Sequence, residues 1–94
     1  MKTICLDSRL LTEMDIPTPA LRLLMSLALL CDTDMTVTAP YRSLTELSGC
    51  NTGDVNKRLV ILENLGLLEV HRPGRGKHAN TYKILSGVSV QYGY

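Results

Sequence analysis

The chain has 94 residues, 45% of them apolar, and a formal net charge of +1. This length predicts a single domain, and the apolar share excludes an intrinsically disordered chain. Phe and Trp are absent, so the core is built mainly from Leu, Val, Ile, Met and Ala, and the abundant Leu favours helix.

The small net charge conceals a gradient along the sequence. Acidic residues outnumber basic ones in residues 1–35, whereas no acidic residue follows Val70. The last segment contains the basic residues Arg72, Arg75, Lys77 and Lys83. A basic patch at one end of a near-neutral domain is typical of contact with phosphate, and a solvated basic loop is the alternative.

The cysteines and the apolar runs argue against metal, redox and membrane functions. Cys5, Cys31 and Cys50 are far apart and form no C-x-x-C pair, so they are interpreted as reduced thiols. The apolar stretch after Lys2 is too short for a signal peptide, and the run interrupted by Arg22 is too short for a membrane span. We expect a cytoplasmic protein without a metal, a small-molecule cofactor or a membrane partner.

Residues 1–16 are expected to be an N-terminal extension, with a short strand and a helical turn as candidate elements. The first firm helix is predicted from Pro19 to about Cys31, capped by Thr18. One apolar stripe on this helix begins at Leu21.

A second apolar stripe lies beside the first, at Leu23, Leu27 and Leu30. A helix that is apolar around most of its circumference is buried around most of it. The second stripe therefore predicts a homodimer interface, and an unusually Leu-rich monomer core is the alternative.

The middle of the chain predicts a short strand and two helices. β-Branched residues favour a strand over 36–38, which Pro40 ends. Ser43 and Glu46 have capping-box spacing and open a short helix that ends at Gly49. Asn51 or Thr52 caps a second helix to about Asn64, which Gly66 closes.

The C-terminal third predicts a β-hairpin. Strands are expected over residues 67–72 and 80–84, with a Gly- and Pro-rich turn over 73–76. Residues 86–94 form a C-terminal tail in which alternating Val and Tyr favour a further strand.

The element order and a set of spaced residues together resemble a known superfamily. Leu44-Thr45-Glu46-Leu47-Ser48-Gly49 is followed by Val55, Leu59, Leu62 and Gly66. This pattern resembles winged helix-turn-helix proteins, including MarR-like regulators and phage and plasmid winged-helix proteins, over roughly residues 19–85. It implies an α+β fold, with a three-helix core and a C-terminal β-hairpin wing, that binds double-stranded DNA.

The helix phase follows from the apolar spacing. Leu44 and Leu47 are expected to point inward, and Val55, Leu59 and Leu62 form one buried stripe. The opposite face of helix 52–64, with Lys57 near its centre, would enter the major groove. An ordinary polar surface helix is the alternative.

The hairpin over 71–83 would contact the DNA backbone or the minor groove, unless it is a basic hairpin without a partner. The acid at Asp54 repels phosphate unless it caps the helix or accepts from a cytosine amino group. The residues predicted to contact DNA are Asn51, Thr52, Asn56, Lys57, Arg58, Arg72, Arg75 and Lys77.

The sequence therefore predicts a sequence-specific DNA-binding transcriptional regulator. A plasmid or phage replication or partition protein is one alternative, and a winged-helix protein-interaction scaffold without DNA binding is the other. An enzyme is not expected, because no catalytic triad, Cys-His pair, phosphate-binding glycine loop or metal-ligand spacing is visible.

Overall fold

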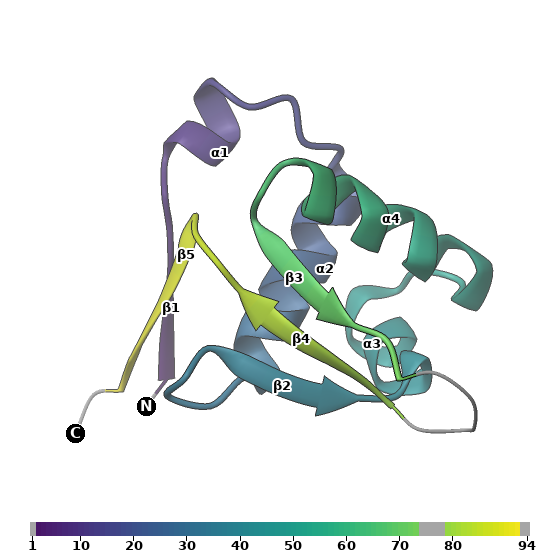
Figure 1. Cartoon of the computed structure of the whole chain (residues 1–94). Coiled ribbons are helices and arrows are strands. Elements are labelled where there is room, and N and C mark those ends of the chain that lie inside the picture. Colours follow the sequence, from purple (N-terminus) through teal and green to yellow (C-terminus); the bar gives the residue numbers. More distant parts are fainter. Residues whose placement is uncertain (1, 74–78, 93–94) are drawn as a thin grey trace.

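The computed structural model describes residues 2–73 and 79–92, which form an α+β fold of four helices and two small antiparallel sheets (Figure 1). The elements are β1 (Lys2–Leu6), α1 (Arg9–Thr12), α2 (Thr18–Leu30), β2 (Thr36–Ala39), α3 (Tyr41–Ser48), α4 (Thr52–Asn64), β3 (Leu68–His71), β4 (Asn80–Ile84) and β5 (Val88–Tyr92). The strands and helices expected from the sequence are all present within a few residues of their predicted bounds.

The two ends of the chain pair with each other. β1 runs antiparallel to β5, with Lys2 opposite Tyr92 and Leu6 opposite Val88. Figure 1 shows these two strands side by side, apart from the second sheet. The segments expected to be an extension and a tail therefore form one structural unit.

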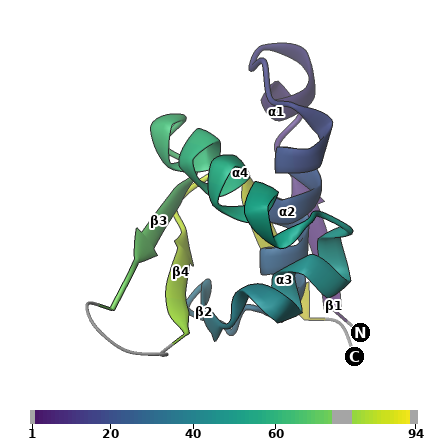
Figure 2. The same cartoon turned by 90° about the vertical axis from the view of Figure 1, so that its right-hand side faces the viewer.

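The second sheet has the strand order β2-β4-β3. β3 and β4 form the predicted hairpin, with Leu68 opposite Ile84 and His71 opposite Thr81. Figure 2 shows this hairpin on one side of α2 and the paired ends of the chain on the other. The hairpin tip, residues 74–78, lies outside the described residues, and with it Arg75 and Lys77.

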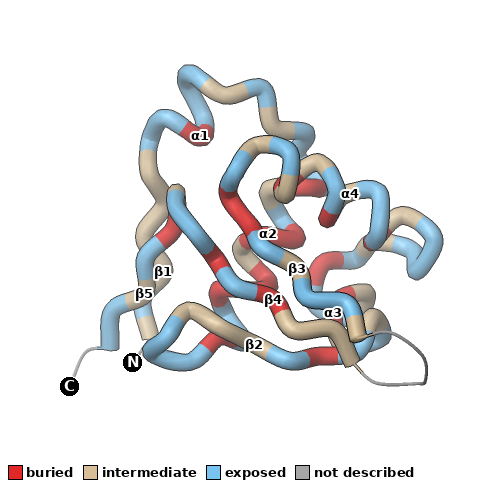
Figure 3. Tube along the Cα trace, in the orientation of Figure 1, coloured by how far each residue is buried: buried red, intermediate tan, exposed pale blue. Residues whose placement is uncertain are grey.

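α2 lies at the centre of the fold and packs against α3, α4, β1, β4 and β5. Buried residues gather where these elements face one another (Figure 3). Leu23 and Leu27 have no exposed surface within the single chain, whereas Leu30 is 39% exposed. The predicted dimer stripe is therefore wrong at Leu23 and Leu27, because the chain's own elements enclose them. Leu23 and Leu27 belong instead to the Leu-rich core of the single chain, which was the alternative expectation.

Two predicted helix starts are corrected. α3 begins at Tyr41 after Pro40, and no side chain caps it, so the Ser43 capping box does not form. The backbone N–H of Ser43 instead donates to the carbonyl oxygen of Pro40 at 3.1 Å. α2 likewise begins at Thr18 itself, without a side-chain cap.

The inward face of α3 also differs from the prediction. Leu44 is buried, but Leu47 is 37% exposed and Ser48 is buried in its place. The Ser48 hydroxyl donates to the carbonyl oxygen of Leu44 at 2.6 Å. This bond satisfies the hydroxyl, so a polar side chain can occupy a buried position.

The turn after α3 and the phase of α4 are confirmed. Gly49 has a φ of +75°, and its N–H donates to the Thr45 carbonyl oxygen at 3.0 Å. A left-handed backbone conformation of this kind favours glycine, and it permits the sharp bend into α4. On α4, Val55, Leu59 and Leu62 are fully buried, as the apolar spacing predicts.

Candidate nucleic-acid interface

The buried stripe of α4 leaves the opposite face of the helix open. Thr52, Asn56, Lys57 and Val60 are exposed, and so is Asn51 just before the helix. α4 also contacts β3, and the two elements lie side by side (Figure 1). The fold thus brings a polar helix face and a β-hairpin together on one side of the molecule.

An ion pair joins the end of the hairpin strand to α4. Arg72, directly after β3, donates to both carboxylate oxygens of Glu63: Nη2 to Oε1 at 2.8 Å and Nη1 to Oε2 at 3.3 Å. The hydrogen bond from this guanidinium to Glu63 is the main reason that the pKa of Arg72 is raised. Glu63 therefore offsets the positive charge of Arg72, one of the residues predicted from the sequence to contact DNA.

Asn56 belongs to the same cluster. Its Oδ1 atom accepts from the Tyr41 hydroxyl at 3.2 Å and from Nη2 of Arg72 at 3.5 Å. Because a guanidinium can only donate, the amide oxygen of Asn56 has to face Arg72. The amide N–H₂ group is then the end of Asn56 that is left to contact a ligand.

Sequence reasoning did not find this cluster of Tyr41, Asn56, Glu63 and Arg72. Glu63 and Asn56 are seven residues apart, two helical turns on one side of α4. This spacing indicates that the two residues share one face of α4. Only tertiary packing brings Tyr41 of α3 and Arg72, directly after β3, close to them.

Arg58 is the one predicted contact on α4 that does not lie with the others. It is partly buried and lines a pocket between α2, the α3–α4 turn and α4. We call this the corner pocket. It has a volume of about 350 Å³ and is lined by Thr18, Pro19, Arg22, Ser48, Gly49, Cys50, Asn51, Asp54 and Arg58.

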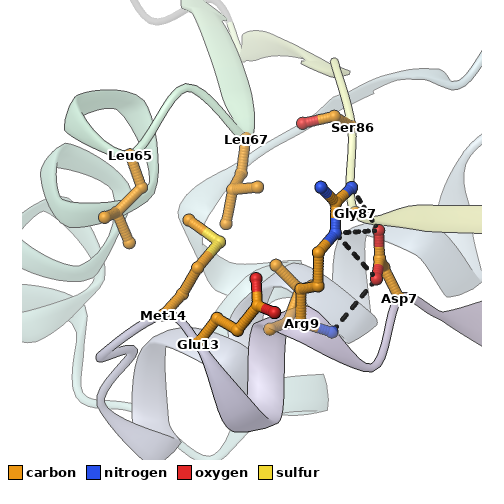
Figure 4. A pocket seen from close by; sticks show the side chains of 9 residues that line it. Asp7, Arg9, Glu13, Met14, Leu65, Leu67, Ser86 and Gly87 are labelled. Carbon is orange, nitrogen blue, oxygen red and sulfur yellow. Dashed lines mark hydrogen bonds and ion pairs between the residues drawn. The ribbon is translucent and has the colours of Figure 1, made fainter.

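A second pocket lies between α1 and the turn that leads into β5 (Figure 4). It is smaller, about 190 Å³, and its charged lining includes Asp7, Arg9 and Glu13. Nη2 of Arg9 lies 2.8 Å from Oδ2 of Asp7, and hydrogen bonds from Arg9 lower the pKa of that carboxyl group. The arginine of this pocket is thus already paired with a carboxylate.

The described residues contain no group of three or more His, Cys, Asp or Glu side chains that could hold a metal ion. Cys5, Cys31 and Cys50 are free thiols, and burial raises the pKa of the Cys31 thiol. In the described part of the chain, no helix combines the length and apolarity needed to cross a bilayer.

No protein-family model, curated protein or solved structure matches the chain.

Proposed function

We propose that the chain is a winged helix-turn-helix protein that binds double-stranded DNA. The observation that carries this proposal is the exposed face of α4, with Lys57 on it, opposite a fully buried apolar stripe and beside the β3–β4 hairpin. A helix presented in this way fits the major groove of B-form DNA, and the hairpin is positioned as the wing.

The cluster around Asn56 specifies which contacts α4 is expected to make. Bidentate recognition of adenine needs both the oxygen and the N–H₂ group of an asparagine amide. The oxygen of Asn56 already accepts from Tyr41 and Arg72. Asn56 is therefore proposed to donate only, to a phosphate oxygen or to the acceptors of guanine.

The positive charge for backbone contacts is proposed to come from Arg75 and Lys77 in the hairpin tip, and Lys57 is proposed to contact a base edge. Arg72 contributes less than its sequence position suggests, because Glu63 holds it at 2.8 Å. Transcriptional regulation is the role we propose for this binding.

Selection of bound fragments from a random duplex pool, followed by fluorescence anisotropy on the enriched site, tests the proposal. Affinity for DNA should fall with salt, with a slope of log K against log salt of about −0.9 for each phosphate contacted. No enrichment, and no salt-dependent binding to any duplex, would reject DNA binding and favour a protein-interaction scaffold.

A homodimer remains a prediction, with a different surface from the one first expected. Leu29 and Leu30, at the end of α2, are 50% and 39% exposed and are accessible to a second chain, unlike Leu23 and Leu27. Sedimentation velocity at micromolar concentration measures the oligomeric state directly, and a single monomeric species would rule the dimer out.

A further inference from the structure

We infer that the corner pocket is a binding site for a small anionic ligand that carries a phosphate or carboxylate group. The pocket volume of about 350 Å³ lies within the range of about 300–1,000 Å³ that is usual for small-molecule sites. Arg22 from α2 and Arg58 from α4 both line it. These arginines lie outside the Arg72 cluster.

Within the described residues, neither guanidinium group forms an ion pair. Ion pairs within 4.0 Å in the described residues involve Arg9, Arg42 and Arg72, and none involves Arg22 or Arg58. The Nε atom of Arg58 is buried and has no hydrogen-bond partner. A buried donor without an acceptor costs about 1–3 kcal/mol.

The guanidinium group of Arg22 lies beside the turn between α3 and α4. A Cβ atom added at Gly49 would lie 3.9 Å from Cζ of Arg22, so the guanidinium lies beside this glycine. The two arginines therefore reach the pocket from different helices. Together they offer a planar oxyanion more donors than one arginine can.

The start of α4 adds a third source of positive potential. The helix has 13 residues, and Asn51 at its N-cap position makes no side-chain hydrogen bond to the first turn. The first backbone N–H groups of an uncapped helix have no intrahelical acceptor, and the helix dipole is positive there. Asn51 also lines the pocket, which places this helix end against the same space as the arginines.

Asp54 narrows the class of ligand further. It lines the pocket and is the acidic residue of the first turn of α4, yet it forms no ion pair with either arginine within 4.0 Å. A carboxylate in a site for an anion selects a ligand that also carries a donor. The structure thus assigns the pocket to a small molecule with an oxyanion for the arginines and an ammonium or hydroxyl group for Asp54.

Occupancy of this pocket should alter DNA binding, a consequence that rests on the proposed function. The lining includes Gly49, Cys50 and Asn51, the residues that set the angle between α3 and α4. A ligand that bridges α2 and α4 across this turn would hold α4 in one orientation. A ligand shifts such an equilibrium only by its differential affinity for the two orientations.

Binding itself is tested on the full chain without DNA. The probe is O-phosphoserine, which has a phosphate and an ammonium group, with serine as the control that lacks the phosphate. NMR titration at constant ionic strength should give saturable shifts of the Arg58 Nε–Hε signal and of the backbone amides over residues 49–54. Serine should give none.

Three variants locate the site. Arg22→Gln and Arg58→Gln should each weaken phosphoserine binding at least tenfold, while Arg42→Gln, on the exposed surface of α3, should leave it unchanged. Arg22 is exposed, so its replacement keeps the fold and remains informative even if the Arg58 variant is unstable. Equal weakening by all three variants, or no saturable shift with phosphoserine, would overturn the inference.

Measuring duplex binding by the same variants distinguishes a free ligand from a DNA backbone phosphate as the anion that occupies the pocket. If phosphoserine does not bind but Arg58→Gln weakens duplex binding tenfold, the pocket receives a DNA phosphate and the small-ligand site is rejected. If phosphoserine binds and no duplex does, the pocket stands and the proposed DNA-binding function fails.

Discussion

Lys57 and Leu59 are two residues apart on α4, but their side chains lie on opposite faces of the helix. Lys57 is exposed, whereas Leu59 has no exposed surface. Lys57→Ala should change the free energy of unfolding by no more than about 0.5 kcal/mol, because exposed substitutions usually do. It should weaken binding to the preferred DNA site by about 1–3 kcal/mol if Lys57 contacts a guanine edge.

Leu59→Ala is the reverse control and should cost about 2–5 kcal/mol of stability by leaving a cavity. Urea denaturation and fluorescence anisotropy measure the two effects on the same samples. A folded Lys57→Ala protein that binds DNA as well as the parent would show that α4 is not the reading helix.

Among the glycines that the structure describes, Gly87 is the one that leaves least room for a side chain. Its φ is +87°, and an added Cβ atom would lie 2.9 Å from Cδ1 of Leu10 and 3.2 Å from Cδ2 of Leu67. Gly87→Ala should therefore destabilise the fold by about 1–3 kcal/mol, through backbone strain and overpacking together.

Gly53 provides the matched control for this change. An added Cβ there meets nothing within 4 Å, and the residue lies in the first turn of α4. Gly53→Ala should be neutral or stabilise the protein by up to about 1 kcal/mol, since alanine restricts the unfolded chain. The midpoint of thermal unfolding should fall for Gly87→Ala and should stay the same or rise for Gly53→Ala. Equal midpoints in the two variants would contradict the strain argument.

At the scale of elements, the ion pair between Glu63 and Arg72 connects α4 to the hairpin. Their side chains are 28% and 40% exposed, so the pair is expected to stabilise the fold by no more than about 1 kcal/mol. Its larger effect is on charge, because Glu63 neutralises an arginine next to the proposed interface. Glu63→Gln should therefore tighten DNA binding and make the salt slope steeper by about one unit, the value for one added phosphate contact.

Glu46→Gln makes the same change in net charge on α3, where Glu46 lies 3.3 Å from Arg42 on an exposed surface. This control should leave the salt slope near that of the parent. Equal steepening in both variants would mean that net charge, and not the release of Arg72, governs the effect.

The sequence predicted the elements well because their signals are local. The phase of α4 follows from three apolar residues at helical spacing, and the turn at Gly49 follows from the conformational freedom of glycine. The start of α3 was wrong because two local signals compete there. The N-cap position of α3 is Pro40, three residues ahead of the capping-box serine.

The site was less predictable because it depends on contacts between distant elements. Arg72 has the pattern of a free basic residue, and only packing brings Glu63 to 2.8 Å from it. Arg58 is one residue beyond Lys57, yet a rotation of about 100° per residue turns it toward α2 and into the corner pocket. No spacing rule indicates that Arg22 meets it there.

For the whole molecule, the paired strands β1 and β5 both pack against α2, the helix that holds Leu23 and Leu27. Val88 on β5 is 8% exposed and belongs to the same hydrophobic core as Leu10 and the leucines of α2. The two ends of the chain are therefore part of the folding unit. A small domain with one continuous core should unfold in a single transition that includes them.

Val88→Asp tests this, because it places a charge without a partner in that core. We expect a loss of at least about 2 kcal/mol of stability, since burying an unpaired charge is costly. Ser89→Asp is the matched control on the same strand, where the adjacent side chain points to the exposed face. It should stay within about 0.5 kcal/mol of the parent, as exposed substitutions do.

Urea denaturation followed by both circular dichroism and intrinsic tyrosine fluorescence measures these changes. If the paired ends and the helical core form one unit, both probes should give the same lowered midpoint for Val88→Asp. A second transition, or an unchanged main transition, would show that β1 and β5 fold separately.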